Sequence, residues 1–290
     1  MSHTFLILTE ASCDLPPERL QAPDVAVVPL HTIVGGVSFE CYPDEREMKL
    51  TDYYARLRNR ERGSTAAPSP ERFIECAEPA LQRGLDVLYI GLAASLSATF
   101  SSGQMAMQQL AERYPDRRIL CVDSHSGSLG EGLLVEEAIK ARDQGKSMDQ
   151  VVELLEGMRQ HVLHCFTVDD LQHLARSGRL SSHTALLGSI LQLKPILWLG
   201  KDNKIRPIDR ARGMRKAMNA IVALVRDKAS DLSNQLLYIG HADALSAARD
   251  LVERLRQAGA RHFVIQGIGP AIGLHGGPGA LGVFFLGDSR

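Results

Sequence analysis

The chain has 290 residues, of which 44% are hydrophobic and 23% are charged, as in a globular protein with one large or two ordinary domains. Its 33 lysines and arginines nearly balance 34 aspartates and glutamates, so no general attraction to nucleic acid or to an anionic membrane is expected. No apolar run reaches the ~18–20 residues that span a bilayer, and the chain does not begin with a signal-peptide pattern. The five scattered cysteines form no CxxC pair, which favours reduced thiols and a cytoplasmic location.

Short apolar runs alternate with amphipathic stretches along the first half of the chain. Such runs are typical of strands buried on both faces of a parallel sheet, and the amphipathic stretches repeat with the helical period. The predicted strands are 4–8, 25–30, 86–92 and 118–122, and the predicted helices are 70–83, 130–144 and 148–161. This alternation predicts α/β layers.

The pattern of apolar residues changes in the second half of the chain, where strand-like runs are more frequent. The predicted strands are 166–168, 196–199, 235–239, 263–266 and 282–286, and the predicted helices are 185–192, 214–228 and 244–258. We therefore expect two α/β domains, residues 1–160 and 161–290.

Two polar loops precede predicted helices and contain candidate ligand-binding residues. In the first loop, Ser69 and Pro70 suit the start of a helix, which leaves Thr65, further from the helix, without a structural explanation. The second loop contains Ser97 and follows the strand 86–92, at the edge where α/β proteins bind ligands. The start of a helix there offers free N–H groups to an anion, although Ser97 could equally cap that helix.

The stretch 267–282 contains seven glycines around His275, which indicates positive φ angles or a close approach of the backbone to another group. It matches neither a P-loop nor a dinucleotide-binding motif. A histidine is more often a packed or surface residue than a functional one, but the surrounding glycines make His275 a candidate ligand.

Other clusters suggest chemistry less strongly. The histidines, cysteine and aspartates within 161–173 match no metal-binding spacing, and Asp169 and Asp170 suit the start of a helix, so no metal site is expected. The sequence lacks GxSxG, but a serine hydrolase of acyl esters that uses Ser97 or Ser124 with His275 remains an alternative function. A nucleic-acid-binding role is disfavoured by the balanced charge.

Taken in order, these segments resemble the DegV family over nearly the whole chain. Each segment alone is a weak match, although the last is more specific than the others. The order that all of them share is what makes the resemblance strong. The matching segments are 9–15 (TEASCDL), 28–30 (VPL), 65–70 (TAAPSP), 96–100 (LSATF), 122–124 (VDS), 128–130 (SLG), 168–171 (VDDL), 177–179 (SGR), 193–197 (LKPIL) and 269–279 (GPAIGLHGGPG). Glu10, Ala11, Ala66, Ala67 and Ala98 depart from the residues usual in the family.

The resemblance implies two α/β domains with a lipid tunnel between them, and a protein that is itself no enzyme and needs no cofactor. It would bind one long-chain fatty acid and present the carboxylate to a separate fatty acid kinase, a dihydroxyacetone-kinase-like protein, for phosphorylation to an acyl phosphate. Transient membrane contact is compatible with this role. The implied carboxylate ligands are Thr65, Ser97 and His275, and Arg212 is implied to contribute to kinase docking, within the basic segment 210–216. We expect Leu129, Leu133, Leu134 and the segment 185–193 to line the tunnel.

Overall fold

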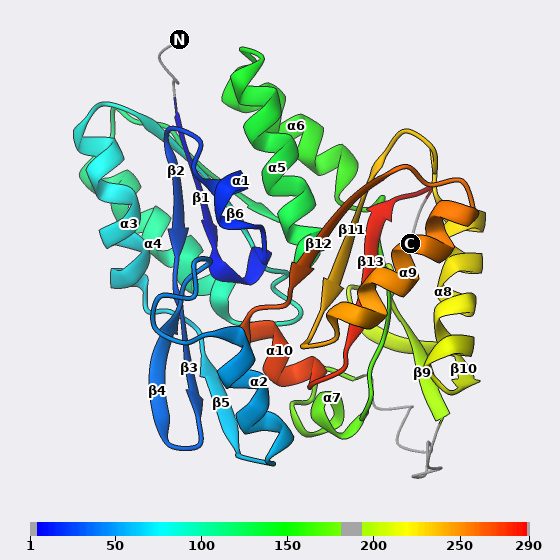
Figure 1. Ribbon diagram of the computed structural model, residues 1–290. Helices are drawn as coiled ribbons and strands as arrows, with labels where there is room; N and C mark the ends of the chain where they lie inside the picture. The colour runs from blue at the N-terminus through cyan, green and yellow to red at the C-terminus, as the bar shows by residue number, and fades with distance from the viewer. Residues whose placement is uncertain (1–4, 181–192, 289–290) are drawn as a thin grey trace.

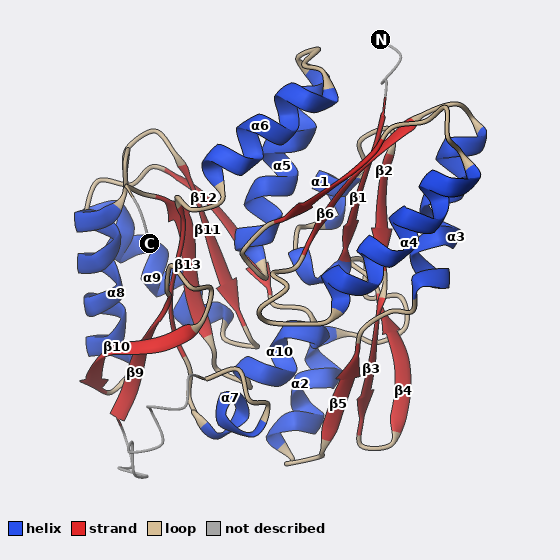
Figure 2. Cartoon of the chain, turned by 180° about the vertical axis from the view of Figure 1, so that it is seen from behind, coloured by secondary structure: helices blue, strands red, loops and turns tan. Residues whose placement is uncertain are grey.

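The computed structural model describes residues 5–180 and 193–288, which form a mixed α/β fold (Figure 1). A parallel sheet in the first half has the order β2-β1-β6-β7. Its strands are β1 (Phe5–Glu10), β2 (Val25–Val28), β6 (Asp86–Gly91) and β7 (Ile119–Asp123). Helices α3 (Pro70–Gln82) and α4 (Thr99–Arg113) cover one face, and α5 (Leu129–Asp143) covers the other (Figure 2). The short η1 (Ala11–Cys13) and α1 (Pro17–Leu20) follow β1.

A small antiparallel sheet extends from the parallel one. It has the order β4-β3-β5, with β3 (Leu30–Val34), β4 (Val37–Cys41) and β5 (Gly63–Ala66). Helix α2 (Leu50–Arg58) lies between β4 and β5 in the chain. This sheet was not expected from the sequence, because its strands are short and only partly buried.

The second half forms a six-stranded mixed sheet of order β10-β9-β8-β13-β11-β12. Its strands are β8 (Val162–Thr167), β9 (Leu193–Leu199), β10 (Ile205–Arg212), β11 (Leu236–His241), β12 (His262–Gly267) and β13 (Leu281–Leu286). Helices α8 (Met214–Lys228) and α9 (Leu245–Gln257) cover one face. The remaining helices are α6 (Met148–Met158), α7 (Gln172–Arg176) and α10 (Pro270–Gly276).

Most predicted elements are confirmed to within a few residues, although β8 begins four residues before the predicted strand 166–168, and α2, β10 and α10 were missed. The predicted helix 185–192 lies outside the described residues. The change from the first to the second large sheet falls between α6 and β8, and the division into two domains near residue 160 stays a prediction.

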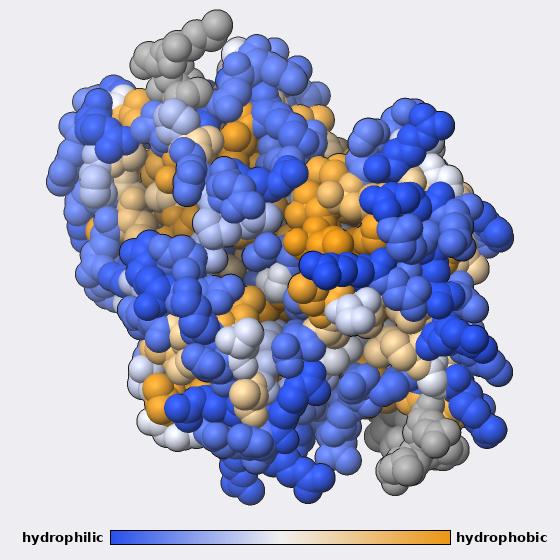
Figure 3. Space-filling view, viewed as in Figure 1, coloured by the Kyte–Doolittle hydropathy of each residue, from blue (hydrophilic) through white to orange (hydrophobic). Residues whose placement is uncertain are grey.

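No helix in the described part of the chain has both the length and the apolar character needed to cross a bilayer. Polar residues cover most of the face shown in Figure 3, with an apolar area over β12.

Helix α5 lies between the two large sheets (Figures 1 and 2). It contacts β1 and β6 on one side and β8, β11 and β13 on the other, so apolar residues of both sheets join one core around it. Two glycines make this close packing possible. A Cβ atom added to Gly130 would lie 2.0 Å from His164 Nε2, and one added to Gly132 would lie 2.5 Å from the carbonyl oxygen of Cys13.

We expect Gly132→Ala to lower the free energy of unfolding by roughly 1–3 kcal/mol, because the methyl group would collide with backbone that cannot rotate away. Gly157 in α6 is the matched control, since it is exposed and a Cβ there would meet nothing within 4 Å. Gly157→Ala should stabilise the protein by roughly 0.5–1 kcal/mol through helix propensity. Chemical denaturation of both variants tests this, and equal responses would contradict the close packing of α5.

Candidate functional site

A cavity of about 250 Å³ lies between the two halves of the chain, where β6 and β7 end and β8 and β13 face them. A single water needs only ~10–15 Å³ on the same measure, so the cavity has room for an organic ligand. Its wall is mainly apolar. The apolar lining includes Leu30, Leu92, Leu96, Phe166, Leu174, Leu199, Ile205, Ile268, Ile272, Leu281 and Phe284.

The three predicted carboxylate ligands come together at this cavity. Thr65 of β5, Ser97 of the loop before α4 and His275 of α10 all line it, although they are far apart in the sequence. Thr65 Oγ1 lies 3.4 Å from His275 Nε2. Ser97 Oγ lies 2.8 Å from Thr99 Oγ1 and accepts a hydrogen bond from the backbone N–H of Thr99. The structure thus places two hydroxyls and an imidazole in one mainly apolar wall.

His275 is held neutral in this position. Burial lowers its pKa to about 4, and the positive charge of Arg179 contributes to the shift. Its Nδ1 atom is buried and has no hydrogen-bond partner among the described residues. A neutral imidazole carries one N–H donor and one acceptor nitrogen, so it can donate to a carboxylate without bringing a charge of its own into the cavity. The positive charge beside it comes from Arg179, which also lines the cavity.

Residues of the first half hold α10, and with it His275, in place. Tyr53 and Tyr54 of α2 donate hydrogen bonds to the carbonyl oxygens of Pro270 and Ile268, at 3.0 and 2.7 Å. A Cβ atom on Gly273 would lie 2.2 Å from the Tyr54 hydroxyl oxygen, so only glycine permits this approach. The close approach expected of the glycine-rich stretch is therefore confirmed here.

The carboxyl group of Asp14 ties the start of α10 to the loop before α5. It accepts hydrogen bonds from the backbone N–H of Gly269, at 2.8 Å, and from the hydroxyl of Ser128. Burial raises the pKa of Asp14 to about 7, although both hydrogen bonds favour the ionised form. Asp14 and Ser128 both have positive φ angles, of 51° and 54°, which are uncommon outside glycine and occur where tertiary contacts impose them.

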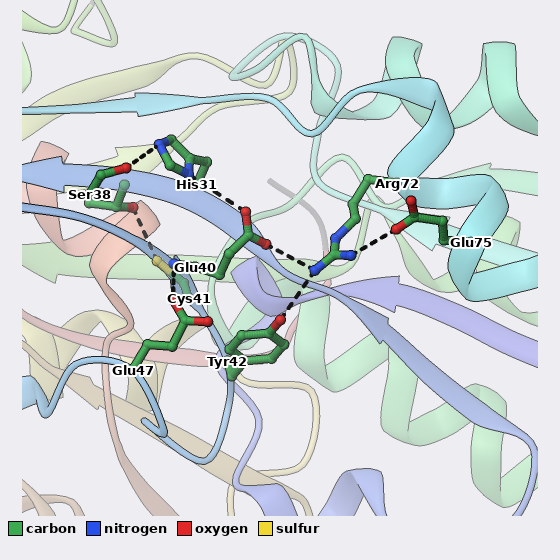
Figure 4. A network of polar contacts seen from close by, with 9 residues as sticks. His31, Ser38, Glu40, Cys41, Tyr42, Glu47, Arg72 and Glu75 are labelled. Carbon is green, nitrogen blue, oxygen red and sulfur yellow. Dashed lines mark hydrogen bonds and ion pairs between the residues drawn. The ribbon is translucent and has the colours of Figure 1, made fainter.

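A polar network supports the small sheet that carries Thr65 (Figure 4). Arg72 of α3 contacts the Glu40 carboxylate at 3.4 Å and the Tyr42 hydroxyl at 3.2 Å, so it links β4 to the helix that begins after the Thr65 loop. On the same sheet, Ser38 Oγ lies 3.0 Å from His31 Nε2, across the β3–β4 pair. These partly exposed contacts orient the hairpin more than they stabilise it.

Two buried carboxyl groups meet beside the cavity. Glu10 at the end of β1 accepts hydrogen bonds from the Tyr89 hydroxyl and from the backbone N–H of Leu92, which lines the cavity. Glu131 of α5 accepts hydrogen bonds from Thr9 and Ser12. Burial raises the pKa of both carboxyl groups, and for Glu131 the neighbouring charge of Glu10 raises it further. The pair therefore retains a proton well above the pH at which an exposed glutamate loses it.

The retained proton makes the stability of the fold depend on pH. The folded chain binds this proton more tightly than the unfolded chain does. The contribution of the pair to the free energy of unfolding is therefore fully present below the ordinary glutamate pKa of 4.5, and it is lost as the pH rises above that value. We expect Glu131→Gln to make the free energy of unfolding fall less than in the wild type between pH 5 and pH 8. Urea denaturation at several pH values measures this. Glu137→Gln, on a partly exposed face of α5, is the control, and parallel curves for wild type and Glu131→Gln would contradict a shared proton.

The structure also places the remaining candidate residues. The Ser124 side chain is buried, forms hydrogen bonds with the backbone of Ser126 and does not line the cavity. No hydrogen bond joins Ser97 to His275 in the described part of the chain, so neither serine is arranged with His275 as a nucleophile with its base. Arg212 lies exposed at the end of β10, away from the cavity lining.

The expected tunnel lining is not found in α5. Leu129, Leu133 and Leu134 pack in the core between the sheets and do not line the cavity. The segment 185–192 lies outside the described residues. Among residues 5–180 and 193–288, no group of three or more His, Cys, Asp or Glu side chains could hold a metal ion.

Arg179 was not predicted from the sequence to line the cavity. It lies in the segment 177–179, which resembles the family pattern, but nothing in the sequence indicated that this turn reaches His275. The contact depends on α7 packing against α10, and α10 itself was not predicted.

Comparison with known proteins gives consistent matches along the whole chain. The model of a family described as uncharacterised proteins of the DegV family matches residues 4–288. A DegV domain-containing protein of Clostridium perfringens is 33% identical over 289 residues, which cover 99% of this chain and 98% of that protein. A DegV domain-containing protein of Streptococcus pyogenes is 32% identical over 290 residues, which cover 99% of this chain and 99% of that protein.

Solved structures match equally well. A fatty-acid-binding DegV family protein of Thermus thermophilus is 29% identical, with a TM-score of 0.86 over 98% of this chain and 100% of that one. DegV of Bacillus subtilis, described as a fatty acid binding protein, is 27% identical, with a TM-score of 0.85 over 99% of this chain and 100% of that one.

Proposed function

This chain belongs to the DegV family, and from that premise we propose that it binds a single long-chain fatty acid whose carboxylate contacts Thr65, Ser97 and His275. The observation that carries the proposal is the cavity itself, which is apolar along most of its wall and is lined by all three of these polar side chains. The relatives from Thermus thermophilus and Bacillus subtilis, described as fatty acid binding, support the same ligand class.

The chemistry of the cavity suits a fatty acid. A buried carboxylate needs hydrogen-bond donors, because its desolvation is otherwise prohibitive, and two hydroxyls and an imidazole N–H can supply them. The nearby Arg179 adds a favourable charge. At ~0.8 kcal/mol for each buried CH₂, a chain of about sixteen carbons gains on the order of 12 kcal/mol before ordering costs. The tail therefore supplies most of the affinity, and the polar end orients the ligand.

We further propose that the chain is a carrier that presents this carboxylate to a separate fatty acid kinase. In that reaction a carboxylate oxygen forms a bond to the terminal phosphorus of the nucleoside triphosphate held by the kinase. The bond from that phosphorus to the departing nucleoside diphosphate breaks, and an acyl phosphate remains on the carrier. The chain itself supplies no nucleophile and no base in this scheme. A separate polar cleft is also lined by Thr65 and His275, and its opening would give the kinase access to the carboxylate.

The head-group assignment predicts a selective loss of affinity. Ser97→Ala and His275→Ala should each weaken fatty acid binding by about 1–3 kcal/mol, the usual value of a hydrogen bond to a charged group. Equilibrium binding of a sixteen-carbon fatty acid by calorimetry measures this. The exposed residues Ser101 and His262 provide matched controls, and their alanine variants should bind as the wild type does. Wild-type affinity in both Ser97→Ala and His275→Ala would refute the assignment.

The docking surface proposed for the kinase is the exposed basic segment at the junction of β10 and α8. Arg210, Arg212, Arg215 and Lys216 are all exposed there. We expect Arg212→Glu to bind fatty acid normally but to support acyl phosphate formation poorly, with the defect strongest at low salt, where attraction between exposed charges is least screened. The measurement is acyl phosphate formed with the cognate kinase. The exposed Arg249 on α9 provides the charge-reversal control, and full activity of Arg212→Glu would remove Arg212 from the docking surface.

A further inference from the structure

Asp14 lies just outside the cavity, between two segments of the cavity wall. Ser128 belongs to one of these segments, and Ile268 and Ala271, on either side of the start of α10, belong to the other. The Asp14 side chain does not line the cavity, but its carboxyl group contacts both segments through Ser128 and Gly269. The spacing of the two segments therefore depends on a side chain that a ligand in the cavity does not touch.

The backbone around this contact is adapted to it. Asp14 and Ser128 both have positive φ angles, which cost energy in residues other than glycine and persist where tertiary contacts impose them. Gly269 contributes in a different way, because a Cβ atom there would lie 2.8 Å from Asp14 Oδ1. Three residues far apart in the sequence thus have the conformation or the size that this one contact requires.

The position of His275 follows that of the first turn of α10. The helix has seven residues and is roughly 10 Å long, so it moves as one short rigid body. Its start is held by Asp14 and by the two tyrosine hydroxyls of α2, and beyond its end the N–H of Gly279 donates a hydrogen bond to the loop after β11. The tyrosines contact carbonyl oxygens, whereas the Asp14 carboxyl group accepts the backbone N–H of Gly269.

We propose that Asp14 is a positioning residue for His275: its carboxyl group holds α10 against the loop before α5 and so keeps the imidazole in the cavity wall. The inference rests on the proposed function, because it takes His275 to be a ligand of the fatty acid carboxylate. Without the carboxyl group the Gly269 N–H would need another partner, and a small pocket of about 30 Å³, lined by Asp14 and Gly269, has room for a water. A water can satisfy that N–H but does not fix α10 to the loop before α5, so α10 would gain freedom to move outward.

The pKa of His275 reports this position without any ligand. Burial and the charge of Arg179 together lower that pKa to about 4, and both effects depend on the imidazole staying in the cavity wall. His275 should therefore stay neutral between pH 5 and pH 7 in the wild type. If α10 moves outward, the imidazole gains contact with water, and its pKa rises toward the ordinary value of 6.5, inside that pH range.

Two variants separate the carboxyl group from the backbone. Asp14→Gly removes the contact but tolerates the positive φ angle of 51°, so no backbone strain is added. Asp14→Asn keeps an amide oxygen for the Gly269 N–H and an amide N–H for Ser128 Oγ, so it should restore the position of α10. The measurement is NMR titration of the His275 ring protons, which are assigned by their absence in His275→Ala. The imidazole should titrate between pH 5 and pH 7 in Asp14→Gly, but not in the wild type or in Asp14→Asn.

Glu136→Gln is the matched control. Glu136 is also a buried carboxyl group outside the cavity, and it accepts a hydrogen bond from Tyr238, but its described contacts reach α1, α5 and β11 rather than α10. The control should therefore leave His275 neutral. A His275 that stays neutral in Asp14→Gly would overturn the proposal. One that titrates in Glu136→Gln or in Asp14→Asn as it does in Asp14→Gly would also overturn it, because the loss would then not come from this pair of hydrogen bonds.

Ligand binding gives a second readout. A sixteen-carbon fatty acid and the fatty alcohol of the same length share their tail, but only the acid brings a charge that needs the imidazole donor. Asp14→Gly should bind the acid roughly 3–10-fold more weakly, as expected for a weakened hydrogen bond to a charged group, and the alcohol within about twofold of the wild type. An equal loss for both ligands would indicate a structural role and overturn the proposal. If the wild type binds no fatty acid while His275 still titrates only in Asp14→Gly, the proposed function fails and the dependence of His275 on Asp14 stands.

Discussion

The fold depends on one helix being buried from almost every side. Helix α5 is packed between the parallel sheet and the six-stranded sheet, and its apolar residues join side chains from both sheets in one core. Gly130 and Gly132 allow this, because a side chain at either position would collide with His164 or with the backbone of Cys13. The two halves share this core, and residues from both halves line one cavity.

The site is likewise assembled across the two halves. His275 comes from the second half of the chain, but the tyrosines of α2 and the carboxyl group of Asp14, all in the first half, determine where α10 lies. The buried acids beside the cavity have a related consequence. Asp14, Glu10 and Glu131 have raised pKa values because they are enclosed where the elements meet, so the same packing that forms the site also makes the stability of the fold sensitive to pH.

Much of this architecture could be predicted from the sequence, and physical reasons explain both the elements that could be predicted and those that could not. The strands β1, β6, β7 and β13 are continuous apolar runs, and α3, α8 and α9 have clear helical periodicity, so their pattern alone indicates them. The hairpin β3–β4 and the strand β10 are short or exposed, and their formation depends on neighbours far away in the sequence. Helix α10 is rich in glycine and proline, which have low helix propensity, and tertiary contacts hold it in place. Thr65, Ser97 and His275 were predicted through the family pattern, whereas the place of Arg179 beside His275 became visible only once α7 and α10 were seen together.

The most direct test of the central claim is native mass spectrometry of the purified protein after incubation with a mixture of long-chain fatty acids. We expect one non-covalent mass increment for each chain, equal to the mass of a single long-chain fatty acid and lost on denaturation. The Ser97→Ala/His275→Ala double variant should retain less of this increment under the same conditions. A protein that carries no fatty acid mass at all, or one that carries a covalent acyl group surviving denaturation, would contradict it.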